Sequence, residues 1–191
     1  MKAIKKIITI KEIIILIGIV LVDLITKLSA NCYLPFKENV SIIGDRVNFY
    51  LIYNEGSIGS HAKILIGFIQ SLFANVTISD WVTSVVLRIV TLIICGIFFC
   101  LSKNKWIRFS FLLILAGGVG NLISHFYSPF RIIDFIFIKG SYELVRIGVF
   151  NLADFVFYIG MVALVISAVV EEIKKSIRKR CNNKKCCKSA K

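Results

Sequence analysis

Long apolar runs bordered by basic patches constrain the fold of this chain more than any other feature. Four runs are long enough to cross about 30 Å of hydrocarbon at about 1.5 Å per residue, and we place them at residues 7–28, 82–101, 106–123 and 150–170. Across its 191 residues the chain is 57% hydrophobic and 18% charged, with a mean hydropathy of +0.81, which is too apolar for a soluble domain. The sequence therefore predicts a membrane α-helical fold with four transmembrane helices.

The basic residues behind the net charge of +13 gather in short patches that flank these runs. The patches lie at residues 1–12, 103–108 and 171–191. Lysine and arginine favour the cytoplasmic ends of membrane helices, so this pattern needs no nucleic-acid partner and puts both termini in the cytoplasm. We expect one domain at residues 1–180, followed by a basic, disordered cytoplasmic tail at residues 181–191.

Two segments on the opposite, outer side are predicted to carry structure of their own. Residues 47–53 alternate in the manner of a β-strand, and Gly44-Asp45 before them is suited to a tight turn, so we expect a small extracytoplasmic β-sheet. Residues 64–74 form an apolar run only half as long as a span, with its apolar positions on one helical face. We interpret that run as a short interfacial helix on the membrane surface.

Asp134 and Asp154 are the most unusual residues in this framework. Both stand in apolar sequence at the outer ends of predicted membrane segments, where an ionised group costs several kcal/mol unless it has a partner. Two neighbouring carboxyl groups with unequal protonation can supply a general base and a general acid. The pair is therefore the candidate catalytic centre.

Other polar residues converge on the same interface, and several have a purely structural interpretation. Asp23 and Lys27 are spaced i, i+4, so an intrahelical ion pair is as good an explanation as a role in the site. Asn151 is well placed to cap the fourth helix. We interpret Arg88 as a residue whose charged end snorkels to the outer surface, and His125 as a surface residue.

Five segments, in order along the chain, carry a resemblance to a known family. They are Asp23-Leu-Ile-Thr-Lys27, Asn54-Glu-Gly-Ser57, Gly117-Gly-Val-Gly-Asn-Leu-Ile123, Ile132-Ile-Asp-Phe-Ile136 and Phe150-Asn-Leu-Ala-Asp154. The chain resembles lipoprotein signal peptidase, also called signal peptidase II, a family of membrane aspartic peptidases. The glycines of the third segment have a second interpretation, because they also permit close helix packing.

The resemblance implies an endopeptidase that needs no metal or cofactor and uses Asp134 and Asp154 as its catalytic dyad. Its substrates would be prolipoproteins whose cysteine carries diacylglycerol, cut just before that cysteine. The enzyme would be a monomer in the lipid of the bacterial cytoplasmic (inner) membrane, with its site at the extracytoplasmic face, and globomycin-type peptides would inhibit it. The substrate-binding or site-supporting residues would be Asp23, Lys27, Asn54, Gly56, Asn121, Arg131 and Asn151.

One departure from the family pattern keeps other functions open. The family usually has Asp-Arg after Asn-Leu-Ile, whereas this chain has Ser124-His125, and Arg131 is our candidate for the missing positive charge. A catalytically impaired relative that binds lipoprotein precursors or lipid without cleaving them is the alternative. A small transporter with intramembrane carboxylates also fits the composition, although it does not predict outer strands or polar groups gathered at one interface.

Overall fold

The computed structural model describes residues 8–44, 46–54, 80–127, 131–139 and 148–189. These residues form long helices and a small antiparallel sheet. In chain order the elements are α1 (Ile10–Tyr33), β1 (Asn39–Ile43), β2 (Val47–Asn54), α3 (Asp80–Leu101), α4 (Lys105–Tyr127), β3 (Ile132–Ile138) and α5 (Leu152–Ser189). The interfacial helix predicted at 64–74 lies outside the described residues.

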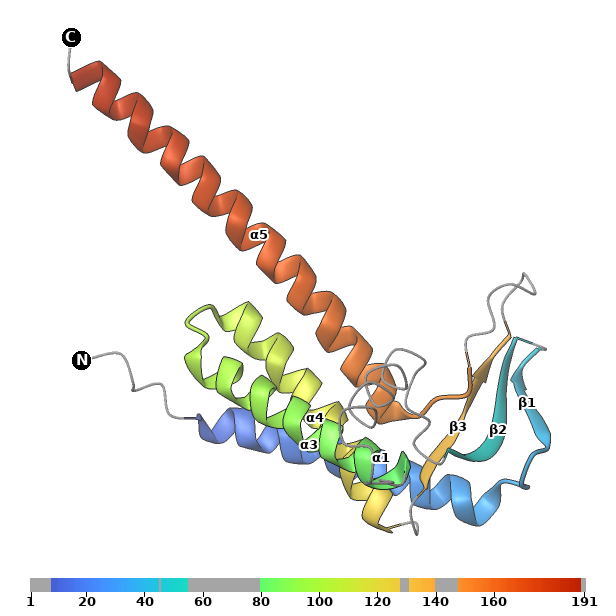
Figure 1. Cartoon of the computed structure of the whole chain (residues 1–191). Helices are drawn as coiled ribbons and strands as arrows, with labels where there is room; N and C mark the ends of the chain where they lie inside the picture. Colours follow the sequence, from blue (N-terminus) through green and yellow to red (C-terminus); the bar gives the residue numbers. More distant parts are fainter. Residues whose placement is uncertain (1–7, 45, 55–79, 128–130, 140–147, 190–191) are drawn as a thin grey trace, which may run out of the picture.

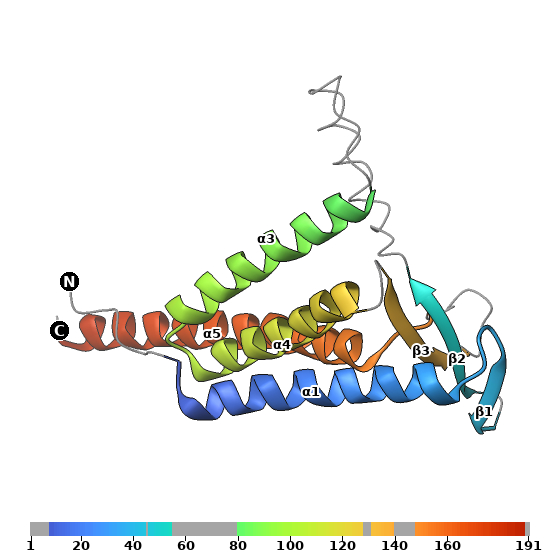
Figure 2. The same ribbon diagram turned by 90° about the horizontal axis from the view of Figure 1, so that it is seen from below.

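Three of the described helices are long and apolar enough to cross a membrane, over Ile10–Tyr33, Lys105–Phe126 and Leu152–Arg180. The apolar part of α3, Val85–Leu101, is shorter. The predicted membrane α-helical class is therefore confirmed, while a full span at 82–101 stays a prediction. Figures 1 and 2 show the sheet at one end of the helices, and the start of α1 and the end of α5 toward the other end.

Helix α4 is the centre of the helical part, since it packs against α1, α3 and α5. Glycines allow α4 and α5 to approach closely. A Cβ atom built on Gly117 would lie 2.9 Å from Phe157 of α5, and one built on Gly160 would lie 2.9 Å from Ile114 of α4. The interpretation of the glycine-rich segment as a helix-packing surface is confirmed here.

The end of the helices away from the sheet is fastened by an ion pair. Thr9 caps α1 and forms a capping box with Glu12, which explains why α1 begins at Ile10. Glu12 also accepts a hydrogen bond of 2.5 Å from Nε of Arg108 on α4. The Arg108 guanidinium lies 4.1 Å from the centroid of the Phe99 ring and donates to the Phe99 carbonyl oxygen at 3.2 Å. These contacts join α1, α3 and α4.

The far end of α5 differs from the predicted disordered tail, because the helix continues to Ser189. Glutamate, lysine and arginine are frequent after Val170, and all three have high helix propensity. Figure 1 shows this part of α5 projecting beyond the other helices.

The sheet rests on the C-terminal end of α1. Its strand order is β1-β2-β3 with both pairs antiparallel, so the strand predicted at residues 47–53 is confirmed as the central one. Gly44, before β2, has a φ of +52°, a backbone conformation that favours glycine. Side chains from two strands pack with Ala30 of α1 in a small apolar core: Leu51, Ile133 and Phe135.

Candidate active site

Asp134 and Asp154 come together because the chain that enters α5 pairs with β3. The backbone N–H of Ile136 donates to the carbonyl oxygen of Phe150 at 2.8 Å, and the N–H of Phe150 donates back at 2.9 Å. This two-residue bridge fixes the first turn of α5 beside the strand that carries Asp134. Asp134 is buried, with 2% of its surface exposed, and Asp154 is half-buried.

Asn151 connects the two carboxyl groups. Its side-chain Nδ2 donates to Oδ1 of Asp134 at 2.6 Å, and its backbone N–H donates to Oδ2 of Asp154 at 3.2 Å. In return the backbone N–H of Asp154 donates to Oδ1 of Asn151 at 2.9 Å, which is the arrangement of a helix cap. The predicted cap is confirmed, and the same side chain also contacts the candidate dyad.

Each carboxyl group has a second asparagine partner. Asn54, at the end of β2, donates from Nδ2 to Oδ2 of Asp134 at 3.0 Å, and Asn121 of α4 donates from Nδ2 to Oδ1 of Asp154 at 2.7 Å. Nearly every polar atom of Asn121 is used, because its Oδ1 accepts from Asn151 at 3.1 Å and from Nζ of Lys27 at 2.9 Å. Side chains far apart in sequence thus hold both carboxylates.

Asp23 and Lys27 form the predicted ion pair, at 2.7 Å, with both side chains almost fully buried. A buried ion pair compensates for its lost hydration only when further hydrogen bonds complete it. Here Oδ1 of Asp23 accepts from the backbone N–H of Ala153 at 2.8 Å, while Lys27 reaches Asn121. The pair therefore does more than stabilise α1: it positions the first turn of α5 and the asparagine that binds Asp154.

Burial and the charge of Asp154 together raise the pKa of Asp134 from 3.8 to about 6, and burial is the larger cause. The hydrogen bonds from Asn54 and Asn151 and the charge of Lys27 lower the same pKa and limit the shift. A carboxyl group that titrates near neutral pH can hold or release a proton during a reaction. The arrangement is suited to general acid–base chemistry by two carboxyl groups in unlike surroundings.

The prediction for His125 is wrong, because its side chain is fully buried. Ser124, in the same C-terminal turn of α4, is also buried. Arg88 differs from a snorkelling residue as well: it is half-buried and interacts electrostatically with Asp134 and Asp154. The only sign of this interaction in the sequence is that Arg88 is a basic residue inside an apolar run.

The roles predicted for Arg131 and Gly56 stay predictions. Arg131 is exposed just before β3, and Gly56 lies outside the described residues.

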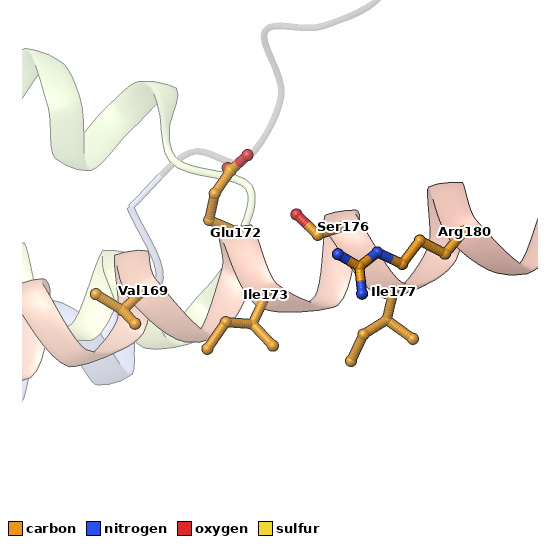
Figure 3. Close-up of a pocket in the computed structure, with 6 residues that line it drawn as sticks. All are labelled: Val169, Glu172, Ile173, Ser176, Ile177 and Arg180. Carbon is orange, nitrogen blue, oxygen red and sulfur yellow. The ribbon is translucent and has the colours of Figure 1, made fainter.

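A surface hollow on α5 lies away from these groups. Figure 3 shows its lining residues, Val169, Glu172, Ile173, Ser176, Ile177 and Arg180. All six come from one helix, and Val169 lies roughly 22 Å along the helix from Asp154. The hollow is not part of the candidate site.

Comparison with solved structures supports the fold. Two structures of a bacterial membrane enzyme superpose with TM-scores of 0.66 and 0.67, each at 19% identity. The first covers 83% of this chain and 92% of the other, and the second covers 86% and 91%.

Comparison with known sequences identifies the family. A lipoprotein signal peptidase of Treponema pallidum (strain Nichols) is 30% identical over 171 residues, which cover 86% of each chain. One from Clostridium tetani is 29% identical over 162 residues, covering 84% of this chain and 92% of the relative. These names favour a peptidase over a relative that binds without cleaving. The model of the signal peptidase (SPase) II family matches residues 15–170, most of the chain, and the chain therefore belongs to the signal peptidase II family.

Proposed function

We propose that this protein removes signal peptides from prolipoproteins with Asp134 and Asp154 as its catalytic dyad. The function follows from the family, whose curated relatives are named lipoprotein signal peptidases. One observation carries the assignment of the dyad: Asn151 donates from its side chain to Asp134 and from its backbone to Asp154. A single residue thus holds the two carboxyl groups in one site.

The proposed reaction begins with the dyad sharing one proton. Two ionised carboxylates in a mostly buried site repel one another, and the raised pKa of Asp134 is consistent with a retained proton. The ionised member takes a proton from water, whose oxygen attacks the scissile carbonyl carbon. The protonated member donates to the developing oxyanion. When the tetrahedral intermediate collapses, the C–N bond breaks and the leaving amine takes a proton from the dyad.

The surrounding residues keep the carboxyl groups in place for these proton transfers. Asn54 and Asn121 bind one carboxylate each, and Lys27 and Asp23 hold Asn121 and the start of α5. None of these side chains needs to exchange a proton itself. Their contribution is a fixed geometry, which removes the need for reorganisation during the reaction.

The membrane would contribute to catalysis by positioning the substrate. A precursor with diacylglycerol on its cysteine keeps its acyl chains in the bilayer, so the scissile bond arrives near the depth of the dyad. Such anchoring replaces a search in three dimensions by a restricted approach. The many apolar side chains exposed along α1, α3 and α5 are suited to contact with lipid.

We further propose four membrane spans in the cytoplasmic membrane, with both termini in the cytoplasm and the dyad at the outer face. The start of α1 and the end of α5 lie away from the sheet, and the basic patches of the sequence fall at that end. The dyad lies beside the sheet. On this view residues 1–180 form a monomeric domain.

The experiment is conversion of a diacylglyceryl precursor by the purified full-length protein in lipid micelles. We expect cleavage before the lipidated cysteine, inhibition by a globomycin-type peptide, and no product with Asp134→Asn or Asp154→Asn. Asn39→Ala, on the exposed strand β1, is the matched control and should cleave like the unaltered protein. Normal processing by either aspartate variant would refute the dyad. Binding of precursor without product by the unaltered protein would refute cleavage.

A further inference from the structure

Arg88 of α3 faces the part of α4 that contributes to the site. One turn further along α3, Leu92 contacts α4, since a Cβ atom built on Gly118 would lie 2.6 Å from Cδ2 of Leu92. Residues four apart share a helix face, so Arg88 lies on this α4-facing side. Because α3 and α4 run in opposite directions (Figure 2), Arg88 lies from Leu92 toward the C-terminal end of α4, and its charge acts on His125 there.

The guanidinium group of Arg88 is expensive to keep at this position. Nε of Arg88 is buried and has no hydrogen-bond partner among the described residues. A charged arginine inside a membrane helix costs several kcal/mol unless nearby groups compensate. The compensation found here is electrostatic: Asp154 and Asp134 both favour the charge of Arg88.

The charges around the dyad balance only when Arg88 is included. Asp23 and Lys27 neutralise one another as an ion pair. A dyad that shares one proton carries one negative charge, and Arg88 carries one positive charge. Among the described buried or half-buried side chains of the site, the sum is zero with His125 neutral. Without Arg88, the sum would reach zero only with both carboxyl groups protonated, a form that has no general base.

We propose that Arg88 is the counter-ion of the singly ionised dyad, a positioning residue that keeps one carboxyl group charged while the other retains its proton. The proposal rests on the proposed function of Asp134 and Asp154. Interaction between charges is reciprocal, so a positive charge on Arg88 also favours the ionised form of the carboxyl groups that act on it. Lys27 also interacts with both carboxylates, but its ammonium group is already bound to Asp23 and Asn121.

The first test is the pH dependence of precursor cleavage. Removing the positive charge with Arg88→Met should make both carboxyl groups harder to ionise, so both limbs of the pH–rate profile should move upward by about one unit. Below the acidic limb kcat/KM should therefore fall about tenfold. Arg88→Lys should keep the limbs close to their original positions. Lys103→Met, which removes an exposed charge beyond the other end of α3, should not move them.

The second test is a thermal-unfolding cycle that does not depend on activity. In the unaltered protein Arg88→Met should lower the unfolding midpoint, because it leaves the dyad without its counter-ion. In the Asp134→Asn, Asp154→Asn background, the same change should raise the midpoint, because it removes a lone buried charge.

The outcomes separate the two proposals. The counter-ion proposal would be overturned if Arg88→Met changed the unfolding midpoint equally in both backgrounds. It would also be overturned if Arg88→Met lowered activity without moving the limbs of the pH–rate profile. Either result would leave the peptidase proposal standing. Absence of cleavage by the unaltered protein would overturn the proposed function, while the unfolding cycle would still report on Arg88. If Arg88→Met fails to fold, Arg88→Gln replaces it in both measurements, with the same expected shifts.

Discussion

Replacement of Asp134 by asparagine should abolish cleavage and also change how stability depends on pH. In the folded protein the pKa of Asp134 is raised from 3.8 to about 6. Between these values the folded state holds a proton that the unfolded state releases, so the free energy of unfolding falls as pH rises from about 4 to about 6. Asparagine does not ionise, so a chain with Asp134→Asn does not undergo this loss.

The magnitude follows from the shift. About two pKa units at about 1.36 kcal/mol each give roughly 3 kcal/mol of stability that the unaltered protein loses across this range. Asparagine offers one acceptor oxygen where the carboxyl group offers two, so a hydrogen bond from Asn54 or Asn151 is lost, at about 1–3 kcal/mol. That second effect does not depend on pH. We therefore expect Asp134→Asn to be less stable than the unaltered protein at pH 4 and about equal or more stable at pH 8.

Reversible unfolding of the full chain in mixed micelles, measured from pH 4 to pH 8, checks the expectation. The quantity of interest is the difference in unfolding free energy between the variant and the unaltered protein at each pH. Asn39→Ala in the same sheet changes no ionisable group, so its difference should stay constant. A constant difference for Asp134→Asn as well would refute a raised pKa, and with it the physical basis for a shared proton.

Two further variants test the packing away from the dyad. Glu12→Gln leaves the buried Arg108 without a carboxylate and should lower the unfolding free energy by about 2 kcal/mol, whereas Glu172→Gln in an exposed ion pair should change it by less than about 1 kcal/mol. Gly117→Ala places a methyl group against the carbonyl oxygen of Ala153 and 2.9 Å from Cβ of Phe157, both on α5, and should cost about 1–3 kcal/mol, whereas Gly96→Ala meets nothing within 4 Å and should be tolerated. Equal effects within either pair, measured by thermal unfolding, would contradict the contacts described.

The features that could be predicted from sequence are those encoded over short distances. A run of apolar residues specifies a membrane helix by itself, and the alternation over residues 47–53 specifies a strand. Asp134 and Asp154 could be found because an acidic residue in an apolar context is unusual wherever the neighbouring helices lie. The cap by Asn151 is also local, since it acts on a backbone N–H three residues away.

The features that could not be predicted depend on which side of each helix faces protein. In a membrane helix the lipid-facing and protein-facing sides are both apolar, so hydrophobic periodicity does not distinguish them. The contact from Lys27 to Asn121, 94 residues away, required the orientation of both helices. For the same reason, neither the burial of His125 nor the helix face on which Arg88 lies could be predicted from the sequence.

The division of the dyad between β3 and α5 has a consequence for biosynthesis. Asp154 belongs to α5, and its position depends on the bridge between Phe150 and Ile136. A growing chain that has not yet delivered this helix to the bilayer has only one of the two carboxyl groups. If the proposed dyad is correct, proteolytic competence arises only once α5 has entered the bilayer, so a chain that has not yet inserted α5 is inert toward precursors beside it.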